Sequence, residues 1–393
     1  MRILLLTESI PYPLDSGGRI KTFNTLRMLG TQHALHLHAF IREARQRTYE
    51  SALRPFVQDV TLHLLPRSIV REASYGLAAL VSGTPYTVRR HFDAAVLARV
   101  TADFERLHCD AIYCDHLSMA EYGRRLGVPM IIDAHNVEYE ILRRYAKGHH
   151  RLSPIRLALE REWRAIRAYE THVYEAARLV FAVSDEDASA IRQMAPATRL
   201  AVAAIAVDTG AIAPVVGPAV GADLLFVGGL HWPPNVEAVA FFLNDVWTQV
   251  LRQRPDARFT VVGRPAPVGR LRQDLPGVTF AGYVDDVKPF YDRRPIVVAP
   301  ILSGSGLRVK ILDAMAHALP VVSTTIGCEG IGARHGQDIL IADTADAFAA
   351  NVVALLNDRQ RAQDLGHAGR SVVEQRFSLD AVGIQMREAI EGL

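Results

Sequence analysis

The fold of this chain is most clearly indicated by the stretch Ser303-Gly304-Ser305-Gly306-Leu307-Arg308-Val309-Lys310-Ile311-Leu312-Asp313-Ala314-Met315-Ala316. It follows an apolar run that ends near Pro300, and it joins a glycine-rich loop to a helical pattern. The N–H groups of such a loop and the positive end of the helix dipole favour phosphate oxygens. Arg308 and Lys310 fall in the predicted first turn, where cations are normally disfavoured, so a bound anion would compensate them. Asp313, about two turns into the helix, could accept hydrogen bonds from ribose hydroxyls.

The spacing of this loop excludes two common nucleotide-binding motifs. It has neither the Walker pattern of glycines and lysine nor the Gly-x-Gly-x-x-Gly of dinucleotide-binding proteins. ATPase and dehydrogenase functions therefore lose support. The alternative to an anion site is that Arg308 and Lys310 are two solvated basic residues on an ordinary loop.

Outward from this loop, short apolar runs alternate with longer helical patterns, which is typical of parallel strands joined by crossover helices. The second half has predicted strands at 223–227, 258–262, 278–281, 296–299, 320–323 and 338–341. The first half has them at 2–6, 34–40, 60–65, 111–114, 130–133, 179–183 and 199–203. The two series predict an α/β protein of two doubly wound parallel-sheet domains that face each other across a cleft, with ligands outside the carboxyl ends of the strands.

The stretch between the two series of predicted strands gives the expected domain boundaries. Residues 204–222 are rich in Ala, Gly, Pro and Val and show little periodicity, so we expect a linker there. We expect a Rossmann-like N-terminal domain at 1–203, a Rossmann-like C-terminal domain at 223–376, and a final helix at 377–393.

The composition is that of a globular protein. Of 393 residues, 49% are hydrophobic and 22% are charged, and the net charge of +2 gives no support to a nucleic-acid binder. Three cysteines without metal-type spacing suggest a reduced, cytoplasmic protein. The apolar run at the N-terminus is too short for an export signal, and we find no run of about 18 apolar residues that could span a membrane.

Two further stretches place chemistry-bearing residues at predicted strand ends. Gly17 and Gly18 follow the first strand and precede a helix that we expect to open at about Ile20, so backbone N–H groups there could approach an anion. A tight turn with no ligand is the alternative. His135 lies just after the strand at 130–133, between polar residues, and is as plausibly functional as structural.

A long helix is predicted at 152–178. Leu159, Trp163, Ile166 and Val173 share one face, and Arg161, Arg164 and Arg167 share another. A solvated basic face is the plainer interpretation. Contact with a membrane surface or an anionic acceptor is the alternative.

Taken together, these motifs resemble those of retaining glycosyltransferases of the GT-B fold, in the large family four (group 1). The resemblance covers essentially the whole chain, and it rests on the order and spacing of several motifs. They are the Gly17-Gly18 loop, Asp133-Ala134-His135-Asn136, 183–187, 226–230 with Pro234-Asn235, 261–264, 282–287, the loop and helix at 304–316, and 319–324.

The resemblance implies transfer of a sugar, with retention, from a UDP-, GDP- or dTDP-linked donor bound by the C-terminal domain. The acceptor would be a hydroxyl of a sugar, lipid-linked or small-molecule acceptor bound on the N-terminal side, and the last helix would return to that side. The implied pathway is polysaccharide, glycolipid or glycoconjugate synthesis by a cytoplasmic protein, and peripheral contact with the inner face of the membrane is compatible with it. No cofactor, metal or nucleic acid is implied.

The family's residue roles carry over onto matching positions. His135, Arg308 and Lys310 would be catalytic, with His135 beside the transferring sugar and the two cations on the leaving diphosphate. The implied donor-binding residues are Gly17, Gly18, Gly228, Arg264, Tyr283, Val284, Gly304, Ser305, Gly306, Leu307 and Asp313, with the base near Tyr283 and Val284 and the ribose at Asp313.

The chain departs from the family pattern in the acidic pair that usually flanks this helix. Ser305 and Asp313 stand where most members have two glutamates, so the donor sugar is left open. Two other functions stay open as well, a nucleotide-sugar epimerase of the same fold and a non-catalytic partner subunit. Release of nucleoside diphosphate from a panel of nucleotide-sugars would separate them.

Overall fold

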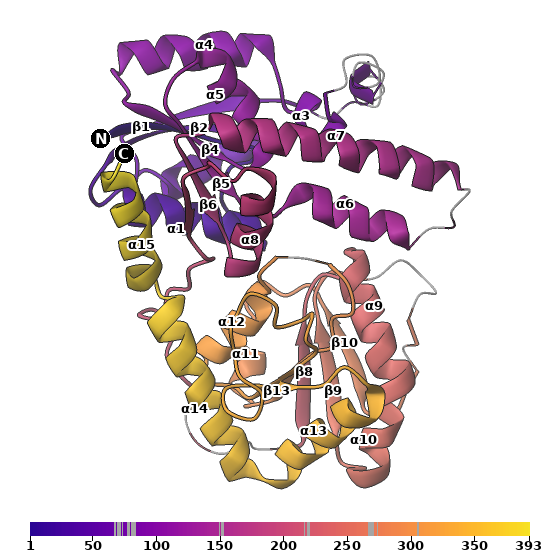
Figure 1. Cartoon of the computed structure of the whole chain (residues 1–393). Coiled ribbons are helices and arrows are strands. Elements are labelled where there is room, and N and C mark those ends of the chain that lie inside the picture. The colour runs from indigo at the N-terminus through magenta and orange to yellow at the C-terminus, as the bar shows by residue number, and fades with distance from the viewer. Residues whose placement is uncertain are drawn as a thin grey trace. The chain divides into compact units, whose positions relative to one another are not determined.

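The structure is a computed structural model of the whole chain, shown in Figure 1. It describes all residues except 67, 69–71, 73, 77, 78, 80–83, 149, 151, 152, 216, 218–220, 266–270, 273 and 305. The chain divides into two compact units, which we call unit 1 (Met1–Ala206 with Val382–Leu393) and unit 2 (Val207–Ala381).

Unit 1 is built on a seven-stranded, fully parallel sheet of order β3-β2-β1-β4-β5-β6-β7. Its strands are β1 Arg2–Thr7, β2 Ala34–Ile41, β3 Asp59–Leu64, β4 Ala111–Asp115, β5 Met130–Ala134, β6 Leu179–Ala182 and β7 Leu200–Val202. The central strands are continuous apolar runs because helices cover both faces of a parallel sheet. Thus every residue of β4, β5 and β6 is buried.

The helices of unit 1 surround this sheet (Figure 1). They are α1 Gly17–Leu29, η1 Ala44–Ala52, α3 Tyr86–Arg89, α4 Ala94–Arg106, η2 Leu117–Met119, α5 Ala120–Leu126, α6 Glu138–Lys147, α7 Pro154–Ala176 and α8 Asp185–Met194. The last helix, α15 Leu379–Glu391, enters unit 1 at Val382.

Unit 2 has a six-stranded parallel sheet of order β10-β9-β8-β11-β12-β13. The strands are β8 Asp223–Val227, β9 Arg258–Val262, β10 Val278–Gly282, β11 Ile296–Ala299, β12 Val321–Ser323 and β13 Leu340–Ile341. The helices are α9 Pro233–Phe241, η3 Phe242–Val246, α10 Trp247–Gln253, α11 Lys288–Tyr291, α12 Val309–Ala316, α13 Ala345–Asn357 and α14 Arg359–Arg376. Its core includes Phe226, Phe242, Trp247 and Phe259, all fully buried.

The α/β fold class predicted from the sequence is confirmed, because every predicted strand is present and both sheets are parallel. The predicted helix at 152–178 is α7, with Ile166 and Val173 buried and its arginines at 161, 164 and 167 exposed. Leu152 lies outside the described residues. In the part of the chain that the structure describes, no helix is long and apolar enough to cross a membrane.

Two helix starts differ from the prediction. The first, α1, begins at Gly17 rather than near Ile20, because Ser16 is still extended and Gly17 already adopts helical geometry. The other, α12, begins only at Val309, since the preceding Gly304 and Gly306 have positive φ angles that cannot continue a helix. Asp313 is therefore a little over one turn into α12, not two.

Candidate functional site

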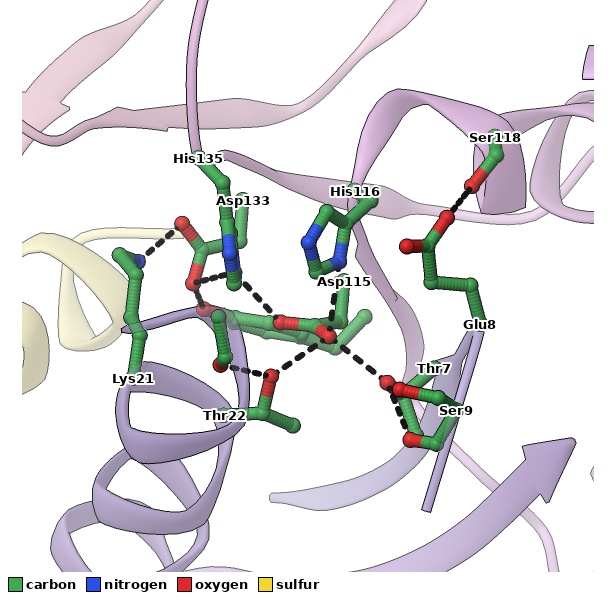
Figure 2. A network of polar contacts seen from close by, with 12 residues as sticks. Thr7, Glu8, Ser9, Lys21, Thr22, Asp115, His116, Ser118, Asp133 and His135 are labelled. Atoms are coloured by element: carbon green, nitrogen blue, oxygen red, sulfur yellow. Dashed lines mark hydrogen bonds and ion pairs between the residues drawn. The ribbon is translucent and has the colours of Figure 1, made fainter. Parts of the chain in front are cut away.

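In unit 1, the carboxyl ends of three neighbouring strands bring polar side chains together. Thr7 at the end of β1 is paired in register with Asp115 at the end of β4, which is paired in turn with Asp133 on β5. Two histidines follow these strands, His116 after β4 and His135 after β5, and Figure 2 shows both beside Asp115. We call this group the strand-end cluster.

Asp115 is the centre of the strand-end cluster, and its side chain has no exposed surface. Its Oδ2 accepts hydrogen bonds from the hydroxyls of Thr7 and Thr22, each at 2.8 Å, and lies 3.1 Å from His116 Nδ1. Its Oδ1 lies 2.8 Å from His135 Nε2. Burial would raise the pKa of Asp115, but His135 and His116 outweigh it and hold that pKa well below its usual range.

The two histidines carry different charges. Burial opposes a charge on His116, but the carboxylates of Glu8 and Asp115 outweigh it and raise its pKa to about 10. For His135, burial and the charge on His116 lower the pKa, so this ring is neutral near pH 7. A neutral ring that donates from Nε2 to Asp115 leaves Nδ1 as a hydrogen-bond acceptor.

A buried ion pair ties α1 to the strand-end cluster. The ammonium of Lys21 donates to Asp133 Oδ1, and Tyr113 donates to Asp133 Oδ2 over 2.7 Å. This pair fixes the start of α1, and with it Gly17 and Gly18, beside the two histidines. A Cβ on Gly18 would lie 3.7 Å from His116 Nε2 and 3.9 Å from His135 Nδ1.

Asp115, His116 and His135 also have the donor atoms to hold a metal ion, since those atoms lie within 4.8 Å of one another. Both ring nitrogens that face Asp115, however, are at hydrogen-bonding distance from its oxygens. Hydrogen bonds therefore account for the donor set, and the sequence-based expectation of no metal stays a prediction.

In unit 2, Lys310 lies at the base of the glycine-rich loop. Its ammonium donates to Asn235 Oδ1 over 2.7 Å and stands 4.3 Å from the centre of the Phe226 ring. Burial and the neighbouring Arg308 lower its pKa to about 7. These contacts argue against the alternative of a merely solvated lysine.

Gly228 makes room for this lysine. A Cβ at Gly228 would lie 2.6 Å from Lys310 Nζ and 3.0 Å from Asn235 Nδ2, which is closer than side chains pack. Asn235 also donates to the carbonyl of Gly229 over 2.9 Å, which holds the start of α9 against the loop after β8. The Phe-Val-Gly-Gly and Pro-Asn motifs thus meet at Lys310.

The loop before α12 brings together the other predicted phosphate-binding residues. Arg308 is the N-cap of α12, and its guanidinium donates to the carbonyl of Gly306. A Cβ on Gly304 would lie 3.5 Å from that guanidinium, and Leu307 is buried beneath the loop. Ser305 lies outside the described residues.

The remaining donor-site predictions fall at two other points of unit 2. After β9 and β10, the Arg264 guanidinium stands 5.5 Å from the centre of the Tyr283 ring, and Tyr283 is 53% exposed next to Val284. Asp313 accepts a 2.7 Å hydrogen bond from Tyr291, and burial raises the pKa of its carboxyl. Its second oxygen lies 3.7 Å from His317 Nδ1.

Sequence reasoning assigned no role to several residues of these groups, among them Asp115, His116 and Asn235. The first two follow a fully apolar strand directly, which is the same pattern that singled out His135. Asn235 belonged to a recognised motif, but its contact with Lys310 joins residues 75 positions apart and needs the fold.

Comparisons with known proteins bear on the fold and on the C-terminal half of the chain. Residues 221–358 match the model of the family Glycosyl transferases group 1. Sucrose-phosphate synthase from Thermosynechococcus elongatus aligns over 100% of this chain and 98% of its own, with a TM-score of 0.70 and 16% identity. HepE of Anabaena, solved in complex with UDP, aligns over 100% of both chains with a TM-score of 0.66 and 15% identity.

The fold and the family match show what this chain is similar to. The chain has the GT-B fold, as the resemblance predicted, and residues 221–358 are similar to the group 1 glycosyltransferase family. A curated relative, an uncharacterized 44.6 kDa protein in the cps region of Klebsiella pneumoniae, is 28% identical over 165 residues. That match covers 39% of this chain and 42% of the relative, so the chain spans less than half of that protein's length.

Proposed function

We propose that this protein is a glycosyltransferase that moves a sugar from a nucleotide-diphosphate sugar to an acceptor hydroxyl, with retention. The observation that carries the proposal is the environment of Lys310. A lysine whose pKa is lowered to about 7 by burial and by a neighbouring arginine is poised to gain from a bound anion. Gly228 and Asn235 hold it at the start of α12, where backbone N–H groups add to the attraction for phosphate.

In this proposal, different residues around the loop bind different parts of the nucleotide-sugar donor. Lys310, Arg308 and the amides of Gly304 and Gly306 bind the diphosphate and stabilise the charge that grows on it as the bond to the sugar breaks. The exposed ring of Tyr283, with Arg264 beside it, supplies a flat surface for the base. Asp313 accepts hydrogen bonds from the ribose hydroxyls.

In unit 1 we propose that His135 contacts a sugar. Because Nδ1 is an acceptor, it suits a hydroxyl better than a phosphate oxygen. The cationic His116 at a ring-centroid distance of 3.7 Å makes His135 a poor base, so its role is to position the sugar, not to remove a proton.

The relative in the cps region supports a place in surface polysaccharide synthesis. We also propose peripheral contact with a membrane through α7, whose start exposes Ile155 and Leu157 by 58% and 63%. Exposed arginines at 161, 164 and 167 lie further along the same helix and would face anionic lipid.

The experiment that tests the function is a panel of UDP-, GDP- and dTDP-linked sugars, each supplied with simple sugar acceptors. Transfer or slow hydrolysis releases nucleoside diphosphate. An epimerase would instead change the donor sugar while the nucleotide-sugar stays intact, and a non-catalytic partner subunit would do neither. Release of no diphosphate from any donor would refute the proposal.

A further inference from the structure

His116 has a strained backbone and a partly buried side chain. Its φ of 81° lies where residues other than glycine are seldom found, and such conformations gather at functional sites. Its ring lies against that of His135, with a centroid distance of 3.7 Å and an angle of 37° between the ring planes (Figure 2).

The shared carboxylate fixes which ring nitrogens carry protons. Asp115 offers one oxygen to His116 Nδ1 and the other to His135 Nε2, so both of these nitrogens donate. Two stacked rings cannot both be charged at low cost. Glu8 lies on the side of His116 and Lys21 on the side of His135, which assigns the charge to His116.

The two free nitrogens therefore have opposite roles. His116 Nε2 carries a proton and donates, whereas His135 Nδ1 carries none and accepts. Both nitrogens lie within 4 Å of the point where a Cβ of Gly18 would stand, so a single ligand next to Gly18 could contact both of them.

We propose that His116 contacts substrate directly, and that His116 and His135 together bind two adjacent hydroxyls of a sugar. One hydroxyl accepts from His116 Nε2, and its neighbour donates to His135 Nδ1. The charge of the strand-end cluster disfavours an anionic ligand, because among the described residues the carboxylates of Glu8, Asp115 and Asp133 outnumber the cations Lys21 and His116. This inference rests on the proposed function and names the chemistry of its unit 1 site.

The test is His116→Asn in the full chain. The amide of asparagine can still donate to Asp115, but asparagine has no group at the position of Nε2. The matched control is His108→Asn, since His108 also has a positive φ, of 49°, and is exposed at the end of α4. Melting temperatures of both variants show whether each is folded.

With the donor and acceptor found in the panel, His116→Asn should lower kcat/KM roughly 10- to 150-fold, the value of a hydrogen bond to a charged group. His108→Asn should match the wild type. Removing the bound hydroxyl from the sugar should cost the wild type a similar factor and the folded His116→Asn protein almost nothing more. Normal transfer by folded His116→Asn would overturn the inference while leaving the transferase function intact.

A second measurement does not depend on transfer. The side-chain 15N signals of the histidines are followed while glucose, mannose, galactose or rhamnose is added to saturation. We expect the signals of His116 Nε2 and His135 Nδ1 to move together with at least one of these sugars, and to a smaller extent with its monodeoxy analogue. If neither signal moves with any sugar, the paired site is wrong, whatever the enzyme assays show.

Discussion

Binding of a nucleotide-sugar should be accompanied by uptake of a proton at Lys310. Burial and then Arg308 lower the pKa of this lysine from its usual 10.5 to about 7 in the free protein. A bound diphosphate supplies negative charge next to the ammonium and raises that pKa again. Between the two pKa values the complex therefore holds one more proton than the free protein.

The size of the effect follows from the free-protein pKa. Near pH 7 about half of the lysines are protonated, so binding takes up about 0.5 proton. Near pH 8 only about a tenth are protonated, and the uptake rises to about 0.9 proton. Above that, each further pH unit should weaken binding about tenfold until the pKa of the complex is reached.

Calorimetric titration in buffers of different ionisation enthalpy measures this uptake directly. A nucleotide-sugar is a better ligand than the nucleoside diphosphate, because its phosphates are esterified at both ends and do not titrate in this range. Lys310→Ala should remove the uptake. Lys288→Ala is the matched control, since Lys288 is an exposed lysine of the same unit whose ammonium pairs with Asp292 at 2.8 Å.

The reasoning is refuted if the wild-type protein binds a nucleotide-sugar near pH 8 without taking up a proton. It is also refuted if Lys310→Ala takes up as many protons as the wild type. In either case the group that meets the diphosphate is not this lysine.

Three other predictions concern the donor loop and the surface of unit 1. Gly228→Ala should fold normally but lose most turnover, because its Cβ would stand 2.6 Å from the flexible end of Lys310 and displace it; unchanged turnover at an unchanged melting temperature would contradict this. Ser305→Glu should shift donor preference in the transfer panel toward fully hydroxylated hexoses, because a carboxylate accepts stronger hydrogen bonds from sugar hydroxyls than serine does. An unchanged ranking of the donors would contradict this prediction. Sedimentation with anionic vesicles should fall when Ile155 and Leu157 are both changed to serine, whereas a wild-type protein that never sediments would rule out membrane contact through α7.

Strands could be predicted from the sequence with errors of one or two residues, because a buried parallel strand shows itself as a local apolar run. The predicted runs at 111–114 and 130–133 became β4 and β5, each one residue longer. The polar residue added at the end of β4 is Asp115, the centre of the strand-end cluster. Its importance arises from register with Thr7 and Asp133, which local patterns do not contain.

The charge states of the site residues could not be predicted from the sequence for a related reason. His116 and His135 are both histidines after apolar strands, yet one is cationic and the other neutral. The difference comes from which carboxylates and cations the fold brings near each ring. In the same way, Lys310 differs from the exposed Lys288 only through burial and its contacts with Asn235, Phe226 and Arg308.

The central claim is that unit 2 holds the diphosphate of a sugar donor at Lys310. The most direct measurement is the turnover of folded Lys310→Ala, compared with Lys288→Ala, using a donor that the wild-type protein accepts. A preorganised cation that stabilises the leaving diphosphate is worth about 3 kcal/mol, so we predict a loss of roughly 10²–10³ in kcat for Lys310→Ala and none for Lys288→Ala. Near-normal turnover by a folded Lys310→Ala protein would contradict the claim.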